Sequence, residues 1–108
     1  MSYLPTTFAA LGDATRFAIV ERLLKDGELA AGELRTVGRL SAPAMSRHLK
    51  VLHEAGIVER RVDKQRRLYS VRPEAVRAIG AWTLSHRDFW QGSLERLGAA
   101  MGRESGKT

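Results

Sequence analysis

Ser46, Arg47 and Lys50 are spaced so that a helix would place all three on one face. Side chains of these types bind polyanions, because an arginine can donate two hydrogen bonds to the edge of a guanine, and serine and lysine bond to phosphate oxygens. Apolar residues at helical spacing would form the opposite face. These are Met45, Leu49, Leu52 and Ala55. A buried apolar back with a polar, cationic front is what a helix that reads DNA requires, and the segment predicts one.

The flanking residues set the bounds of this reading helix. Ser41 is a good N-cap, and Gly56 is a common stop signal. A shorter helix is predicted before it, over about residues 30–37, and the link between the two, residues 38–41, begins with a glycine. Two helices joined by so short a link are typical of a helix-turn-helix.

The period of the apolar residues changes after Gly56 from helical to alternating, and strand-forming residues predominate. We predict two strands, at about 58–62 and 67–71, with a polar hairpin tip between them. Helices followed by a helix-turn-helix and then a β-hairpin describe a winged helix. The sequence therefore predicts a mainly α fold with a small β-hairpin as its wing.

Three more helices complete the expected set of five helices plus the wing. They cover about residues 4–11, 14–25 and 73–100, the last of them long for so small a chain. We expect one winged-helix domain over residues 1–101, with dimerisation helices at its two ends, and a flexible tail at 102–108. The residues expected to point inward from the second helix are Phe17, Val20, Leu23 and Leu24.

The charge and the residue composition limit the kinds of partner that the protein could bind. The formal net charge is +6, and residues 47–72 alone carry eight Lys or Arg against three acids. A basic balance of this kind suits nucleic acid first and an anionic membrane second. The sequence has no cysteine, which excludes disulfides and thiolate metal sites, and no catalytic motif, so we expect neither an enzyme nor a cofactor. Without a membrane-spanning run or a signal peptide, the expected location is the cytoplasm.

The motifs resemble those of the ArsR-type bacterial repressors. Leu11–Arg16 is similar to their L-x-D-x-T-R opening, and Leu40–Val58 to their LS-x-x-x-SRHLK-x-L-x-x-AG-[LIV]-V core. Arg60–Val71 resembles their basic wing, and the whole resemblance covers about residues 4–77. It implies a homodimeric winged-helix repressor that binds a double-stranded DNA operator and blocks a promoter until a signal releases it. We assign no inducer.

In such repressors the start of the reading helix contacts the bases, and the wing reaches phosphate or the minor groove. Here Arg47 would bond guanine, while Ala42, Pro43 and Ala44 would contact thymine methyl groups. Ser41 and Lys50 better suit phosphates, which position the protein without specifying a sequence. The predicted DNA-binding residues are Ser41, Ala42, Pro43, Ser46, Arg47, His48, Lys50, Arg61, Lys64, Gln65, Arg66, Arg67 and Tyr69.

The sequence departs from the metal-sensing members of that family, which carry a cysteine pair near the start of the third helix. This chain has Ala30 and Gly32 there, and neither side chain offers a ligand. A zinc site on the last helix would have only His86 and Asp88, which point about 200° apart on a continuous helix. We assign no metal ligand. A metal-responsive repressor that uses the last helix remains an alternative, and so does a winged helix that binds another protein.

Large apolar residues form a stripe on the last helix, and others lie near the N-terminus. We interpret them as a dimer seam, with a ligand pocket as the alternative. The predicted interface residues are Leu4, Phe8, Leu11, Ile79, Trp82, Phe89, Trp90, Leu94, Leu97 and Met101.

Overall fold

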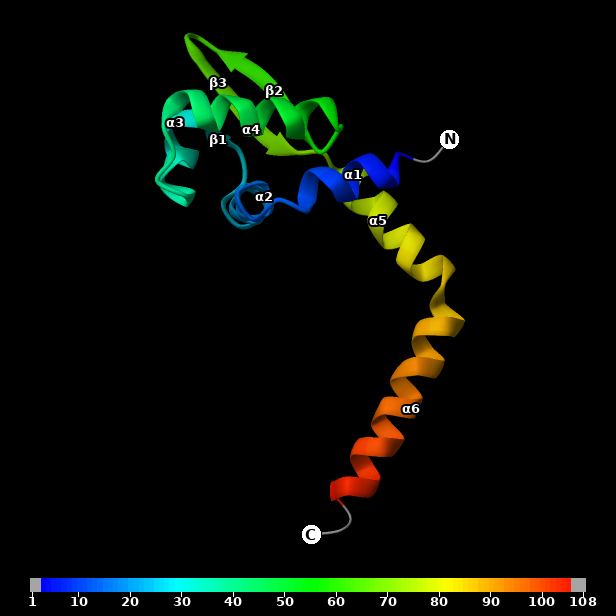
Figure 1. Cartoon of the computed structure of the whole chain (residues 1–108). Helices are drawn as coiled ribbons and strands as arrows, with labels where there is room; N and C mark the ends of the chain where they lie inside the picture. The colour runs from blue at the N-terminus through cyan, green and yellow to red at the C-terminus, as the bar shows by residue number, and fades with distance from the viewer. Residues whose placement is uncertain (1–2, 106–108) are drawn as a thin grey trace. The chain divides into compact units, whose positions relative to one another are not determined.

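The computed structural model describes residues 3–105, and the side chains of residues 3–102. The chain forms two units, one within residues 1–78 and one within residues 79–108, and α5 runs from the first into the second. The elements in chain order (Figure 1) are α1 Leu4–Leu11, α2 Ala14–Asp26, β1 Leu29–Ala30, α3 Ala31–Leu34, the 3-10 turn η1 Arg35–Val37, α4 Ala42–Glu54, β2 Val58–Asp63, β3 Arg66–Val71, α5 Pro73–Ser85 and α6 Arg87–Ser105.

The first unit is the predicted winged helix. Its core is built from one face of α2, the back of α4 and the base of the hairpin. Met45, Leu49 and Leu52 of α4 are each at most 1% exposed, which confirms the buried back of the reading helix. No helix within residues 3–105 is long and apolar enough to cross a membrane.

Two of the inward positions predicted for α2 are wrong. Phe17 is 50% exposed and Leu24 is 55% exposed, whereas Ile19 is fully buried. Phe17 and Leu24 are seven residues apart and share a face that lies about 100° around the helix from the buried one. A single contact surface buries only a stripe of an amphipathic helix, and here Ile19, Val20 and Leu23 form that stripe.

The L-x-D-x-T-R segment joins α1 to α2. Asp13 caps α2, because its carboxylate accepts a hydrogen bond from the backbone N–H of Arg16 at 3.0 Å. This hydrogen bond holds the pKa of Asp13 below its ordinary value. The Arg16 side chain donates from Nε to the carbonyl of Ala10, 2.7 Å away, and so satisfies a carbonyl at the end of α1.

The sheet has a third strand that the sequence did not predict. Its order is β1-β3-β2 and all pairs are antiparallel, with Leu29 opposite Tyr69 and Ala30 opposite Leu68. A two-residue strand is too short to show an alternating pattern. It occupies the start of the helix predicted over about residues 30–37, which consists instead of the single turn α3 and the 3-10 turn η1.

The link between α3 and α4 turns at Arg39 rather than at Gly38. Arg39 has φ +54°, in the left-handed region, whereas Gly38 has φ −135°. A residue with a Cβ atom pays about 1–2 kcal/mol for this conformation, because its Cβ approaches the following carbonyl oxygen. The turn of the helix-turn-helix therefore holds local strain at an arginine.

Arg39→Gly is expected to be more stable than Arg39→Ala by about 1 kcal/mol, since glycine adopts positive φ without the Cβ conflict. Arg35, with φ −60°, is the matched control. There the order should reverse, because glycine in a helical conformation is about 0.5–1 kcal/mol less favourable than alanine. Urea unfolding of the four variants measures both differences, and the same order at both positions would contradict the assignment of strain to Arg39.

The single long helix predicted over about residues 73–100 is two helices that meet at His86. The Ser85 hydroxyl donates to the carbonyl of Trp82 at 2.7 Å, and His86 Nδ1 lies 2.9 Å from the same oxygen. The backbone N–H of His86 turns instead to the carbonyl of Thr83. Side chains that compete for backbone groups in this way end a helix.

α6 continues through Ser105, into the segment predicted as a flexible tail, and residues 106–108 lie outside the described part of the chain. Gly102 is by itself insufficient to end the helix, because one glycine in a helix costs only about 1 kcal/mol.

Candidate nucleic-acid interface

The front of α4 is exposed from its first turn onward. The Ser41 hydroxyl accepts a hydrogen bond from the backbone N–H of Ala44 at 3.2 Å and caps the helix. The exposed side chains of residues 42–50 are Ala42, Pro43, Ser46, Arg47 and Lys50. They lie opposite the buried back of the helix, so the residues expected to contact bases all face solvent.

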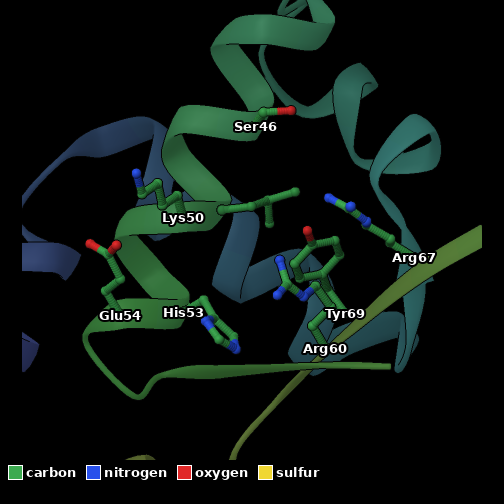
Figure 2. A pocket seen from close by; sticks show the side chains of 8 residues that line it. Ser46, Lys50, His53, Glu54, Arg60, Arg67 and Tyr69 are labelled. Carbon is green, nitrogen blue, oxygen red and sulfur yellow. The ribbon is translucent and has the colours of Figure 1, made fainter. Parts of the chain in front are cut away.

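A groove separates the front of α4 from the hairpin of β2 and β3. It encloses about 350 Å³ and lies entirely within the first unit. In Figure 2 the guanidinium of Arg67 and the hydroxyl of Tyr69 point from the strands toward α4. The residues that line it are Ser46, Leu49, Lys50, His53, Glu54, Arg60, Arg67 and Tyr69. With three of its side chains permanently cationic and one acidic, the groove suits an anion such as a phosphate backbone.

Strand alternation divides the arginines of the wing between two faces. Arg60 lies opposite Tyr69 in the ladder, and Arg67 lies opposite Val62, so Arg60 and Arg67 share the groove face. Arg61 and Arg66 are the next residues along their strands and therefore point to the other face. The predicted cluster of wing cations is in fact two separate pairs.

The arginines of the second face are bound to carboxylates. Arg61 makes two hydrogen bonds to Glu28, at 2.8 and 2.7 Å, and Arg66 donates to Glu33 at 2.9 Å. The hydrogen bond from Arg61 lowers the pKa of Glu28, and the same contact raises the pKa of Arg61. This changes the expectation for Arg61 and Arg66, because each is already neutralised by an acid of the same chain.

Two of the predicted DNA-contact residues are less exposed than the front of α4. Tyr69 is 6% exposed, and its ring is part of the hydrophobic core. His48 is half-buried on the flank of α4. It lies about 100° around the helix from Arg47, out of the exposed front. The ring of Tyr69 thus packs in the core although Tyr69 also lines the groove, and the predicted DNA contacts of Tyr69 and His48 stay predictions.

The structure adds three polar groove residues that the sequence interpretation missed, His53, Glu54 and Arg60. A signal existed for two of them. His53 continues the series of Ser46 and Lys50 at helical spacing, and Arg60 alternates with buried Val58 along its strand.

At the tip of the wing, Lys64 has φ +59° and is exposed together with Gln65. Neither side chain makes a hydrogen bond or an ion pair within the described part of the chain. Both remain available to a partner.

The metal alternative rests on His86 and Asp88, which border one shallow hollow at the break between α5 and α6. The angle expected between them on one continuous helix does not apply, because α5 ends at Ser85 and α6 begins at Arg87, which leaves His86 between the two helices. His86 Nδ1 is engaged with the Trp82 carbonyl. Among the described residues, no three His, Cys, Asp or Glu side chains are close enough to hold a metal ion together.

The residues predicted for the dimer seam are largely exposed. On α1, Phe8 is 42% exposed, while Leu4 and Leu11 are half-buried. In the second unit, Ile79 is half-buried and Trp82 is 41% exposed. The ring of Phe89 meets the ring of Trp90 edge-on, with centroids 4.9 Å apart. The remaining members, Trp90, Leu94, Leu97 and Met101, form a stripe along α6 whose exposed fractions are 41%, 67%, 56% and 58%.

Comparison with known proteins agrees with this geometry. Residues 11–61 match the family model of a helix-turn-helix domain. The chain is 49% identical over 70 residues to the HTH-type transcriptional regulator Rv2034 of Mycobacterium tuberculosis, a match over 65% of this chain and 64% of that protein. It is 31% identical over 78 residues to the transcriptional repressor SdpR of Bacillus subtilis, over 72% of this chain and 86% of the relative.

Among solved structures, the ArsR family transcriptional regulator RHA00566 superposes with a TM-score of 0.72 at 26% identity, covering 82% of this chain and 91% of that one. The chain therefore belongs to the ArsR family of winged helix-turn-helix transcriptional regulators. It spans slightly less than two thirds of the length of Rv2034.

Proposed function

We propose that the protein is a homodimeric repressor that binds a specific sequence of double-stranded DNA. The observation that carries this proposal is the cationic groove between the exposed front of α4 and the wing. Lys50 of the helix and Arg60 and Arg67 of the strands all line it. The relative SdpR is named a transcriptional repressor, which supports the direction of regulation. Such a protein would act in the cytoplasm, with the DNA, and we assign it no cofactor.

The roles of the side chains follow from their positions. α4 would lie in the major groove, with Arg47 reading guanine, and Ala42, Pro43 and Ser46 facing the neighbouring bases. Ser41 and the groove cations, together with Lys64 and Gln65 at the wing tip, would contact the phosphate backbone. Arg61 and Arg66 are left out of this set because of their glutamate partners.

A second copy of the chain completes the site. The stripe on α6 is too exposed for an isolated helix in water, and a twin stripe would bury it. The predicted interface residues of α1 and α5 are proposed to belong to the same seam. Two-fold symmetry would present two reading helices about 34 Å apart, one turn of DNA, on a palindromic operator.

Arg47→Ala is expected to weaken binding to the preferred sequence by about 1–3 kcal/mol and to relax the preference at one base pair. Arg67→Gln is the comparison, because loss of a phosphate contact weakens all sequences alike. Fluorescence anisotropy with a duplex enriched from a random pool, and with single-base variants of it, separates the two effects. Unchanged affinity and base preference in Arg47→Ala would refute the role given to Arg47.

A further inference from the structure

The two faces of the wing carry the same kind of side chain in opposite electrostatic states. On the groove face, Arg60 and Arg67 have no carboxylate within ion-pair distance in the described part of the chain. On the other face, Arg61 and Arg66 each have one, and both partners come from the segment around β1 and α3. Each pair joins residues that are 33 positions apart in the sequence.

We propose that Glu28 and Glu33 increase the sequence specificity of DNA binding. They do so by neutralising Arg61 and Arg66, so that only the groove face of the wing adds cations to the DNA contact. This inference rests on the proposed DNA-binding function. It goes further by stating which wing arginines are withheld from DNA and which residues withhold them.

The geometry of the two acids supports a fixed arrangement. The Glu33 carboxylate also accepts a hydrogen bond from the backbone N–H of Ala30 at 3.1 Å, so the start of α3 holds it in place. Glu28 binds Arg61 through both carboxylate oxygens, and two-point contacts of this kind constrain orientation as well as distance. To bind a phosphate, either arginine would have to break its ion pair. The carboxylate left unpaired would then lie near the phosphate and repel it.

Net charge decides the effect on DNA. Exposed ion pairs contribute little to folding, but an arginine with a bound carboxylate is neutral as a unit and releases no counterion from DNA. Phosphate contacts raise the affinity for every sequence, whereas base contacts discriminate between sequences. If only the groove arginines of the wing contact phosphates, non-specific binding is weaker. The base contacts of α4 then contribute a larger share of the binding free energy.

The test compares Glu33→Gln with the wild type on the enriched duplex and on a scrambled duplex of equal length, by anisotropy over a range of salt concentrations. Glutamine keeps an acceptor for Ala30 but cannot neutralise Arg66. The variant should bind the scrambled duplex more tightly, with a log–log salt slope steeper by about 1.8, which is about 0.9 for each of the two wings of the dimer. Its advantage over the wild type should shrink about twelvefold as salt rises from about 50 to about 200 mM. Glu28→Gln should act in the same direction through Arg61.

Glu59→Gln is the matched control. Glu59 lies on the same face of the wing, and its described contact is a hydrogen bond from Ser70 at 3.4 Å, so its removal changes the net charge equally but releases no arginine. It should leave the salt slope unchanged. Arg66→Gln should also keep the wild-type slope, whereas Arg67→Gln should lower it. Combining Glu33→Gln with Arg66→Gln should restore the wild-type slope.

An equal rise in slope for the Glu59 and Glu33 variants, or a loss in Arg66→Gln as large as in Arg67→Gln, would overturn the inference. Neither result would contradict the proposed function, because the wild type would still bind DNA in a salt-dependent way. If the wild type itself shows no salt-dependent binding to either duplex, the proposed function and the inference both fail.

Discussion

Replacing Leu94 and Leu97 together with glutamate is expected to convert the protein from a dimer to a monomer and to weaken operator binding by about 10²–10⁴-fold. Both side chains are more than half exposed on the stripe of α6. In the proposed seam they would meet their symmetry mates, so four carboxylates would be buried against apolar groups. The loss in DNA affinity exceeds the loss of any single contact, because a monomer no longer benefits from the second half-site.

Sedimentation equilibrium measures the change of association state, and anisotropy with the enriched duplex measures the change of affinity. Ala99→Glu is the control, because Ala99 is exposed on the opposite side of α6 from the stripe. It should leave both the dimer and the affinity intact. A double variant that remained dimeric, or a monomer that bound the duplex as tightly as the wild type, would contradict the proposed seam.

The second large effect is expected from Leu52→Ala, which should lower the free energy of unfolding by about 2–5 kcal/mol. Leu52 is completely buried on the back of α4. Its removal leaves a cavity in the thin core that holds the reading helix to α2 and to the base of the wing. A loss of this size is a large part of the stability of a domain of this length, whose total is about 5–15 kcal/mol.

Urea unfolding followed by circular dichroism measures the loss. The adjacent Val51→Ala is the control, because Val51 is 38% exposed and should cost much less than Leu52→Ala. DNA binding by Leu52→Ala should recover at temperatures where the variant is folded, since Leu52 makes no contact with the groove. Equal losses from the two variants would show that α4 is not anchored through its back.

The segment around β1 and α3 corresponds to the cysteine site of metal-sensing family members, and in this chain it contacts the wing. In the metal-sensing proteins that the sequence resembles, this region carries a cysteine pair, and here Ala30 and Gly32 stand in its place. The acids that flank them, Glu28 and Glu33, bind the wing instead. In this chain the segment places two carboxylates beside the wing, where each binds an arginine.

The parts of the structure that follow from neighbours in the sequence were predictable. The reading helix was expected between Ser41 and Gly56, and α4 spans Ala42–Glu54. The two strands of the wing lie within one residue of their expected bounds. Caps, helical spacing and alternation act over one to seven residues, so each could be read from the chain directly.

Other features depended on which segments meet. Phe17 and Leu24 looked like core residues because the spacing of α2 alone does not say which stripe is covered. The strand β1 exists because β3 is there to pair with it, and the break at His86 depends on side chains that take over backbone acceptors.

The sequence by itself determined that this is a winged helix with a cationic reading helix and a basic wing, because charge and periodicity are local properties. Only the tertiary structure decided which of the wing's cations are free to bind an anion. Arg60 and Arg61 are neighbours, yet one lines the groove and the other is bound to Glu28. Strand alternation separates the two side chains, and the fold brings a carboxylate from 33 residues away to one of them.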